Sequence, residues 1–410
     1  MLCDLPSRQS AVLMPSGLPD QPPLVILYHH RTQARDGQFV HVEELISALR
    51  KLGHHVVVVA PGRARGVKFG EDSQLGMAAK RYIPLPVYEL LEFAYSIPEF
   101  FALARAYWRY RPDAFYQRAN VFMLSGVMLA RLFRVPFLLE VNSPLAEERN
   151  RFGRVSLSGL AAWTEHALWR AADRVLPVTG VLSRKIAAAG VPTDRIVVAP
   201  NGVDLEKFSV KSEASDRGRR GLDGKLVLGL VGFIREWHRA DAIIDLLAGG
   251  VLPENSHFLV VGDGPVRDAL ITQARRLGVG DRLTITGIVP RDQVADYIRC
   301  FDIALQPDVV EYASPLKLIE YMALGCAILA PDRENIRELL SHGESALLVQ
   351  PGDAAGLGAA LARLARDAPL RRRLGEAAQR AIVSRNLTWL HNAKRVEALS
   401  RQLAASLARA

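Results

Sequence analysis

A strand, a helix and a second strand follow one another near the start of the chain, and this order constrains the fold more than any other feature. Residues 24–30 (LVILYHH) form a short apolar run that ends in polar residues, which is typical of a buried strand. From Gln38, apolar residues recur at helical spacing until Gly53, a residue type that commonly ends a helix, and 55–61 (HVVVVAP) reads as the next strand. Because a crossover helix joins parallel strands, the chain is predicted to begin a parallel α/β sheet.

The same alternation continues and then starts a second time. A strand is predicted at 134–142, a helix at 158–172, and strands within 173–179 and 194–204. Periodicity is lost in a polar stretch between 207 and 224. A second series of strands follows, at 225–233, 257–264, 282–289, 301–307 and 326–331. We therefore predict an α/β protein with two Rossmann-like, doubly wound parallel sheets.

These patterns divide the chain into segments. They are a disordered leader 1–23, an N-terminal domain 24–206, a linker 207–224, a second domain 225–384 and a closing helix 385–410. The leader lacks the continuous apolar core of a signal peptide, and no run of about 18 uncharged apolar residues predicts a membrane span. We expect a cytoplasmic protein. Residues 87–110 are rich in aromatic and apolar side chains, and core packing or a covered groove is favoured there over a membrane interface.

Composition narrows the function classes. The three cysteines, Cys3, Cys300 and Cys326, show no metal-binding spacing and exclude a disulfide framework. The formal charge of +9 comes from basic residues spread along the chain, without the aromatic and basic interleaving of an RNA-binding sheet. We expect no nucleic-acid partner; solvated surface arginines, a phosphorylated ligand or an anionic membrane surface account for the charge instead.

Three glycine-containing or basic stretches follow predicted strands. Gly37 precedes the first helix, where free N–H groups favour an anion. Residues 260–265 (VVGDGP) lack the third glycine of a dinucleotide fingerprint, which argues against an NAD-dependent oxidoreductase. At the end of the first strand of the second half, Arg235 and His238 are predicted to surround the mouth of a cleft and contact a diphosphate.

The most specific motif is EYASPLKLIE, residues 311–320. Its Ser-Pro turn opens a helix whose first N–H groups suit a diphosphate. Glu320, about one and a half turns into that helix, is placed to accept hydrogen bonds from ribose hydroxyls.

Together these stretches resemble the retaining nucleotide-sugar glycosyltransferases of family 4, which have the GT-B fold. The resemblance rests on the segments DGQFVHVEELISALRKLGHHVVVV, APNGVDLEKF, VVGDGP, TGIVPRDQVADYI and SPLKLIEYMALGCAILA. It implies a donor nucleotide held by the second domain, acceptor contacts from the first, and a last helix that crosses back to the first domain. The variant with WH after a strand and SPLKLxEYMA in the cleft looks like bacterial enzymes of exopolysaccharide or envelope glycan assembly. For the cytoplasmic protein expected here, a location at the inner face of the cell membrane stays open.

The resemblance also assigns roles, with departures. In the register of the family's acidic pair, Glu320 matches the second glutamate, whereas Tyr312 stands where the first is expected and Glu311 lies one place early. Phe233 and His238 replace the usual Arg and Lys, so Arg235 is assigned the arginine role and His238 the lysine role, with a charge that depends on pH. Asn142 stands where the family has a first-domain histidine.

The full predicted site therefore has three parts. The catalytic residues are Arg235, His238, Glu311 and Glu320; the donor-binding residues are Gly37, Gly264, Ile288, Tyr312, Ser314, Pro315, Leu316 and Lys317; the acceptor-side residues are His41 and Asn142. No DxD motif stands at a strand end, so no metal and no cofactor are predicted beyond the nucleoside diphosphate sugar as co-substrate.

The expected reaction moves a sugar from a nucleoside diphosphate sugar to a hydroxyl of a glycan or lipid-linked acceptor, with retention at the anomeric carbon. Two alternatives remain open. One is a catalytically degenerate sugar-nucleotide or glycan-binding protein of the same fold, and the other is a sugar-nucleotide 2-epimerase that needs no acceptor.

Overall fold

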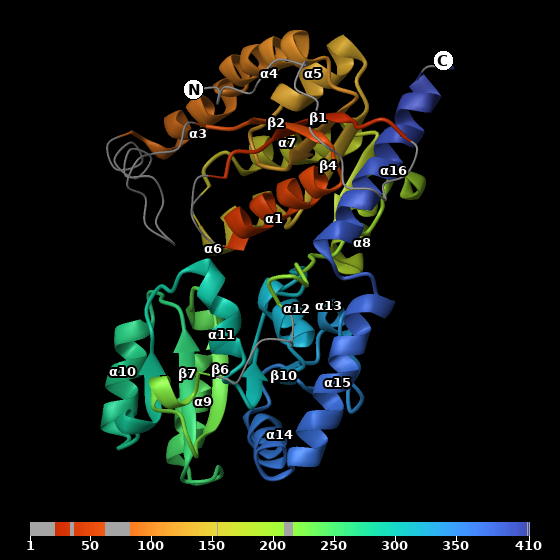
Figure 1. Cartoon of the computed structure of the whole chain (residues 1–410). Helices are drawn as coiled ribbons and strands as arrows, with labels where there is room; N and C mark the ends of the chain where they lie inside the picture. Colours follow the sequence, from red (N-terminus) through yellow and green to blue (C-terminus); the bar gives the residue numbers. More distant parts are fainter. Residues whose placement is uncertain are drawn as a thin grey trace.

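The chain folds around two parallel β-sheets that face each other across a cleft (Figure 1). The computed structural model describes residues 21–32, 37–61, 83–153, 155–208, 216–407 and 409. Most of the predicted leader lies outside the described residues. The predicted α/β fold class is confirmed.

The first sheet has the strand order β2-β1-β3-β4-β5. Its strands are β1 (Val25–His29), β2 (His55–Val59), β3 (Ala114–Arg118), β4 (Phe137–Val141) and β5 (Arg174–Pro177). Its helices are α1 (Gly37–Lys51), α3 (Leu85–Ala94), α4 (Ser96–Tyr110), α5 (Ser125–Phe133), α6 (Leu145–Phe152), α7 (Ser158–Ala171) and α8 (Gly180–Ala188). Because strand order reverses between β1 and β3, the carboxyl ends of these strands open a crevice that suits a ligand.

The second sheet has the order β11-β10-β9-β6-β7-β8. Its strands are β6 (Leu226–Val231), β7 (Ser256–Val261), β8 (Leu283–Ile285), β9 (Ile303–Leu305), β10 (Ala327–Pro331) and β11 (Leu347–Val349). Its helices are α9 (Ala240–Ala248), α10 (Arg267–Arg276), α11 (Val294–Ile298), α12 (Leu316–Ala323), α13 (Glu334–Arg337), α14 (Ala354–Arg366) and α15 (Ala368–Ser384). Here strand order reverses between β6 and β9, which places a second crevice opposite the first.

Central strands are buried on both faces, which is why they read as continuous apolar runs rather than alternating ones. Every residue of β6 is buried. Within β6, a Cβ at Gly229 would lie 2.1 Å from the ring of Phe301, so only glycine leaves room for this aromatic side chain.

The predicted strand in 194–204 does not form. The structure has only isolated bridges there, Val175 to Ile196 and Val203 to Thr388. The segment leaves the sheet edge and packs against the start of α16 (Trp389–Leu407), where a Cβ at Gly202 would lie 2.5 Å from the Trp389 nitrogen. Strands β3 and β11 were not predicted.

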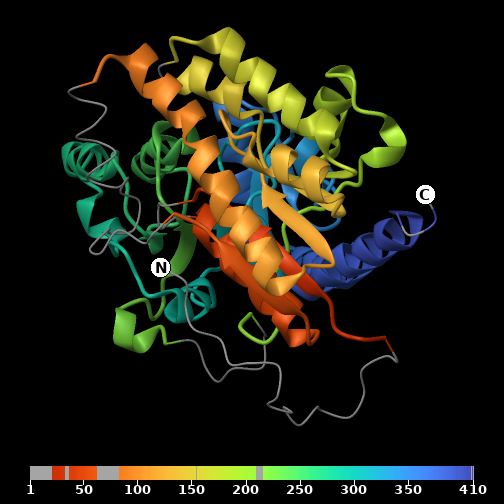
Figure 2. The ribbon, with the colours of Figure 1, turned by 90° about the horizontal axis from the view of Figure 1, so that it is seen from above.

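The last helix crosses back to the first domain, as expected. In Figure 1 and in the view from above in Figure 2, α16 lies beside the first sheet rather than with the second domain that precedes it. Its buried Trp389, Ala393 and Val396 share one apolar cluster with Val42 and Leu45 of α1. This packing ties the chain's end to the first domain.

The favoured interpretation of 87–110 was wrong for much of the segment. Helices α3 and α4 lie on the side of the first domain away from the second (Figure 1). They expose large apolar side chains together with α5, namely Leu90, Leu91, Ile97, Phe101, Trp108 and Leu132, which we call the outer apolar face. Amphipathic helices here cover the sheet with one side only. Within the described residues, no helix is both long and apolar enough to span a membrane.

Candidate functional site in the cleft between the two domains

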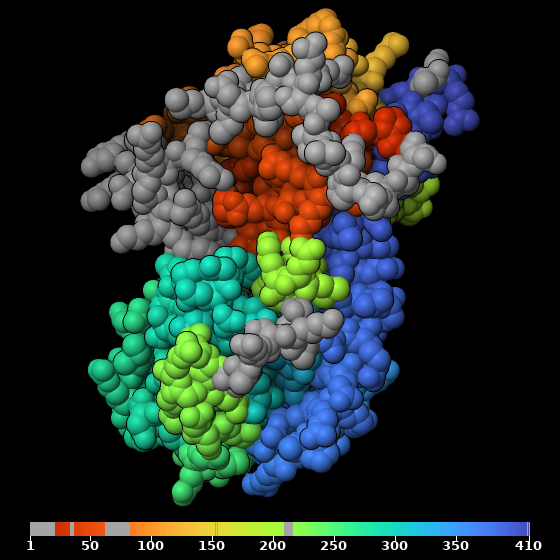
Figure 3. All heavy atoms as spheres, viewed as in Figure 1, coloured from red at the N-terminus to blue at the C-terminus, as the bar shows by residue number. Residues whose placement is uncertain are grey.

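The carboxyl ends of both sheets border one cleft with a volume of about 760 Å³. The chain passes between the halves beside it, through the segment near residue 200 and the start of α16 (Figure 3). The cleft is large enough for a sugar nucleotide, since ligand pockets commonly measure about 300–1,000 Å³. Most of the predicted site residues line it, from both domains: Gly37, His41, Asn142, Arg235, His238, Ile288, Tyr312, Ser314, Leu316, Lys317 and Glu320.

Glycines and cations form the second-domain wall. Gly232 and Gly262, which follow β6 and β7, both have positive φ. They pack so closely that a Cβ at Gly262 would lie 2.1 Å from the carbonyl oxygen of Gly232. The backbone is therefore open to a ligand at these strand ends. Next to it, the exposed Arg235 guanidinium lies 5.1 Å from the ring centroid of Phe233 and 5.2 Å from that of Trp237.

His238 differs from the expectation of a partly charged group. Burial lowers its pKa to about 2, and the positive charges of Lys317 and Arg235 act in the same direction. The backbone N–H of Arg235 donates to Nδ1 of His238 at 3.0 Å, which leaves the ring proton on Nε2. His238 is thus a neutral hydrogen-bond donor near neutral pH, and a pH-dependent charge at this position is not supported.

Lys317 supplies the charge that His238 lacks. Burial lowers its pKa to about 8, an effect partly offset by Glu320, so the ammonium remains mostly protonated at neutral pH. Its Nζ lies 3.4 Å from the position that a Cβ on Gly232 would take. Within the described parts of the chain, this ammonium has no hydrogen bond or ion pair. An unpaired, partly buried cation beside open backbone is suited to an anionic ligand.

Glu320 is buried on α12 and has a partner that sequence reasoning missed. Nη2 of Arg291, in the short turn Arg291–Gln293, donates to Oε1 of Glu320 at 2.5 Å. The Arg291 guanidinium also lies 5.0 Å from the ring centroid of Phe208. One carboxylate oxygen of Glu320 is therefore held in place, and the carboxylate still has acceptor capacity for a ligand hydroxyl. Arg291 stands directly after the proline of the segment TGIVPRDQVADYI. This position was the sequence signal that could have identified Arg291 as a site residue.

The segment before α12 reaches across the cleft. The Tyr312 ring is buried in the apolar cluster of the first domain, and its hydroxyl donates to Oε1 of Glu148 at 2.6 Å. Ser314 is joined to Asn201, whose backbone N–H donates to the Ser314 hydroxyl at 3.1 Å and whose Nδ2 donates to the Ser314 carbonyl at 2.6 Å. Neither Glu148 nor Asn201 was predicted.

Three predicted residues do not line the cleft. Glu311 is exposed to solvent, because its neighbour Tyr312 takes the inward position, so a catalytic role for Glu311 is not supported. Pro315 is the residue before the first turn of α12. Gly264 is required by packing instead, since a Cβ there would lie 2.0 Å from the carbonyl oxygen of Ile234.

The first-domain wall is a buried polar network around Glu140 of β4. His41 Nε2 lies 2.8 Å from Glu140 Oε2, and Arg118 Nη1 lies 2.5 Å from Oε1, to which the Asn142 amide also donates. Burial would raise the pKa of Glu140, but His41 and Arg118 hold it well below its ordinary value. Nδ1 of His41 lies 2.7 Å from Oδ1 of Asn201. Arg118 was missed because β3, which ends with it, was not predicted.

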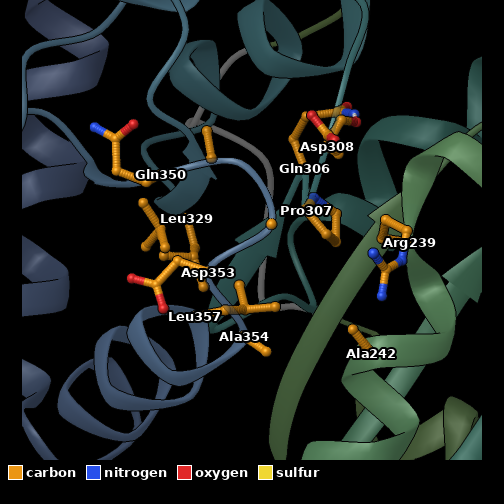
Figure 4. A pocket seen from close by; sticks show the side chains of 13 residues that line it. Arg239, Ala242, Gln306, Pro307, Asp308, Leu329, Gln350, Asp353, Ala354 and Leu357 are labelled. Atoms are coloured by element: carbon orange, nitrogen blue, oxygen red, sulfur yellow. Dashed lines mark hydrogen bonds between the residues drawn. The ribbon is translucent and has the colours of Figure 1, made fainter.

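A second cavity of about 50 Å³ lies at the carboxyl ends of β9, β10 and β11 (Figure 4). Its lining comes from the loop and helix after β11 on one side and from Arg239 and Ala242 on the other. Oε1 of Gln306 is buried there and has no hydrogen-bond partner among the residues that the structure describes. The cavity holds space for a water molecule and is too small for a sugar. Among the described residues, no group of His, Cys, Asp or Glu side chains is arranged to hold a metal ion.

Comparison with protein families matches both halves of the chain. Residues 35–207 match the glycosyltransferase family 4 model, and residues 225–367 match the model for glycosyl transferases group 1. The chain belongs to the family 4 glycosyltransferases. The predicted family and enzyme class are thereby confirmed.

Relatives of this glycosyltransferase act on different sugars. A GDP-mannose-dependent alpha-mannosyltransferase of Mycobacterium tuberculosis is 26% identical over 352 residues, 84% of this chain and 88% of the relative. A 2-deoxystreptamine N-acetyl-D-glucosaminyltransferase of Streptomyces fradiae is 29% identical over 282 residues, 66% of each chain.

Solved structures show the same fold. Anabaena Alr3699/HepE in complex with UDP-glucose has a TM-score of 0.70 at 18% identity, covering 94% of this chain and 100% of its own. Sucrose-phosphate synthase from Thermosynechococcus elongatus has a TM-score of 0.72 at 19% identity, covering 93% and 100%. These neighbours establish that the two sheets and the cleft form the GT-B arrangement of this glycosyltransferase.

Proposed function

We propose that this glycosyltransferase transfers a sugar from a nucleoside diphosphate sugar to a hydroxyl of a glycan or lipid-linked acceptor, with retention of anomeric configuration. The second domain holds the donor and the first domain receives the acceptor. In this role the acceptor belongs to bacterial polysaccharide or cell-envelope synthesis, and the enzyme works at the inner face of the cell membrane.

The observation that carries the donor assignment is the set of cationic and donor groups gathered at glycine-rich strand ends. Lys317, Arg235 and the Nε2–H of His238 all border the cleft beside Gly232 and Gly262. As the glycosidic bond breaks, negative charge develops on the leaving diphosphate, and preorganised donors of this kind stabilise it. Glu320, fixed by Arg291, then suits the ribose hydroxyls. The structural neighbour that contains UDP-glucose supports a nucleotide-sugar donor.

Retention is proposed from the family resemblance and is compatible with a path in which the acceptor attacks from the face that the diphosphate leaves. The bond between the anomeric carbon and the diphosphate oxygen breaks, and its electron pair leaves with the diphosphate. A new bond forms between the anomeric carbon and the acceptor oxygen. The acceptor proton departs with the diphosphate. A closed cleft excludes water from this step, so we expect slow donor hydrolysis without acceptor.

The first experiment is calorimetric and thermal-shift titration of the protein with UDP, GDP, ADP, dTDP and CMP. We expect one nucleotide to bind, with about 2.7 kcal/mol of stabilisation at 100 times its dissociation constant. Glu320→Gln should weaken that binding, because the neutral amide is a poorer acceptor for the ribose. Glu311→Gln is the matched control, since its side chain is exposed outside the cleft, and it should bind as the wild type does.

Product analysis with the matching sugar nucleotide separates the alternatives. Transfer to an acceptor with retained configuration, detected by NMR, supports the proposal. Conversion of the sugar nucleotide without acceptor indicates a 2-epimerase. Tight nucleotide binding without any conversion across a broad acceptor set indicates a binding protein and refutes the enzymatic role.

The membrane contact is supported by the outer apolar face. Phe101 and Leu132 are 65% and 64% exposed on the neighbouring helices α4 and α5. The same helices expose Arg105, Arg109 and Arg131, and no exposed Asp or Glu lies on either of them. Apolar and cationic side chains together fit the interface of an anionic bilayer.

Vesicle co-sedimentation tests this contact. We expect binding to vesicles containing phosphatidylglycerol and weaker binding to neutral phosphatidylcholine vesicles. Phe101→Glu combined with Leu132→Glu should abolish binding, while Val383→Glu should not, because Val383 is 70% exposed on α15 of the other domain. Equal sedimentation of the wild type and the double variant would show that another surface, or none, contacts lipid.

A further inference from the structure

The acidic residue that is missing from the motif before α12 has a counterpart on the opposite wall of the cleft. In the family register, the position eight residues before Glu320 holds Tyr312 rather than a carboxylate. The structure places a carboxylate from another element beside the Tyr312 hydroxyl. Glu148, on α6 of the first domain, lines the cleft and accepts the hydrogen bond of the Tyr312 hydroxyl at 2.6 Å.

Glu148 is held on both of its oxygens. Oε1 accepts from Tyr312, and Oε2 accepts from the Ser143 hydroxyl at 2.9 Å. Because each carboxylate oxygen accepts two hydrogen bonds, both retain capacity for a ligand. The carboxylate is half-buried, so it is accessible from the cleft but lies where water screens it less than at an open surface. It is a preorganised anion in the first-domain wall of the cleft, which Asn142 also lines.

Tyr312 itself is suited to positioning rather than to chemistry. Burial raises the pKa of its phenol well above the ordinary value, and the neighbouring carboxylates of Glu148 and Glu147 raise it further. The phenol therefore stays protonated and donates. Its ring is buried among first-domain residues, and its carbonyl accepts from the Thr179 hydroxyl at 3.0 Å. The orientation of the Glu148 carboxylate thus depends on a residue that the second domain supplies.

We propose that Glu148 is a catalytic residue, the carboxylate that faces the transferred sugar, and that Tyr312 is its positioning residue. As the bond from the anomeric carbon to the diphosphate breaks, positive charge develops on the sugar, and the ionised Glu148 stabilises that charge without forming a bond to it. The proton balance of the reaction is unchanged. Because Tyr312 comes from the other domain, its hydrogen bond orients the Glu148 carboxylate only when the two domains are together. The proposal rests on the nucleotide-sugar donor of the proposed function.

The competing interpretation is that the Tyr312–Glu148 contact only fastens the domains together. Glu338 provides a matched control for it. This carboxylate of the second domain accepts from the backbone N–H of Gly180 in the first domain, at 2.9 Å to each oxygen, and does not line the cleft. A second control is Glu147, the exposed neighbour of Glu148, whose carboxylate pairs with Lys185 at 2.6 Å.

The test is steady-state transfer by the full-length chain, with nucleotide binding measured in parallel. For Glu148→Gln we expect kcat to fall roughly 100-fold or more, with the dissociation constant of the free nucleotide unchanged within about twofold, because the lost charge acts in the transition state. Glu148→Asp keeps the charge but moves it back by one methylene, so its kcat should lie between those of the wild type and Glu148→Gln. For Tyr312→Phe we expect a loss of roughly tenfold in kcat, with little change in KM for the donor.

Glu338→Gln and Glu147→Gln should keep the wild-type kcat. The proposal is overturned if Glu148→Gln transfers like the wild type, or if Glu338→Gln loses as much kcat as Glu148→Gln does, since the contact is then only a fastening. A wild-type protein that neither binds a nucleotide nor transfers a sugar refutes the donor assignment instead, so the two failures are distinguishable.

Discussion

Replacing Lys317 by methionine should have opposite effects on the stability of the free protein and on its affinity for nucleotide. In the free protein, burial lowers the pKa of Lys317 from 10.5 to about 8. At about 1.36 kcal/mol per pKa unit, that difference is an electrostatic cost of about 3 kcal/mol. Water in the cleft reduces it, so we expect Lys317→Met to stabilise the free protein by about 1–2 kcal/mol at pH 7.

The sign of the pH dependence follows from the lowered pKa. The folded protein binds the Lys317 proton less tightly than the unfolded chain does, so the cost is fully present below pH 8 and disappears as the pH rises toward 10.5. Urea unfolding midpoints of the wild type and the variant should therefore differ most at pH 7 and converge near pH 10.

Nucleotide binding should change in the other direction. A charge-assisted hydrogen bond from an ammonium to a phosphate is worth about 1.5–3 kcal/mol, which corresponds to a dissociation constant roughly 10- to 150-fold weaker in Lys317→Met. Isothermal titration with the nucleoside diphosphate measures it. Lys394→Met, at an exposed position of α16, is the control and should change neither quantity. A variant that is less stable at pH 7, or that binds nucleotide as tightly as the wild type, would refute the reasoning.

Three further substitutions test two buried carboxylates of the first domain and the glycine turn at the end of β7. Burial raises the pKa of Glu165 to about 7, so the carboxyl group ionises as the pH rises through 7 and its buried charge then destabilises the folded protein. In urea unfolding, Glu165→Gln should be more stable than the wild type by about 2–3 kcal/mol at pH 8.5 and nearly equal to it at pH 4.5. Glu99 has its pKa lowered to about 2 against its own burial, through hydrogen bonds from His29 and Arg31; Glu99→Gln should cost about 3–5 kcal/mol at pH 7, a difference that shrinks as the pH falls toward 2, and a constant difference would contradict the ion-pair account. Gly262→Ala should lower both the melting temperature and nucleotide affinity, since its Cβ would lie 2.1 Å from a carbonyl oxygen, whereas Gly278→Ala, with nothing within 4 Å, should leave nucleotide affinity unchanged.

Periodicity in the sequence was sufficient to predict most strands and the two-sheet architecture. The strand β6 is buried on both faces, so each of its consecutive residues is apolar or small. Such a continuous run can be recognised from neighbouring residues in the sequence. The strand β3 escaped prediction because its last residues, Gln117 and Arg118, are polar yet buried. The burial of Arg118 depends on its ion pair with Glu140, which lies on another strand of the sheet.

The residues of the candidate site also divide into those that the sequence could predict and those that it could not. Glu320 and Lys317 were recognisable because they stand in one helical segment beside a Pro-fixed turn, and the turn's local geometry brings them to the cleft. Glu148 carried no such signal, since its role follows from a hydrogen bond to Tyr312, 164 residues further along the chain.

Sequence alone thus determined the expectation of two parallel sheets, of a cleft at their carboxyl ends and of the helix that carries Glu320, because periodicity and turn residues are patterns of neighbouring residues in the chain. Only the tertiary structure decided which side chains face one another across the cleft. The neutral state of His238, the pairing of Arg291 with Glu320 and the inward position of Tyr312 depend on burial and on charges that folding brings together.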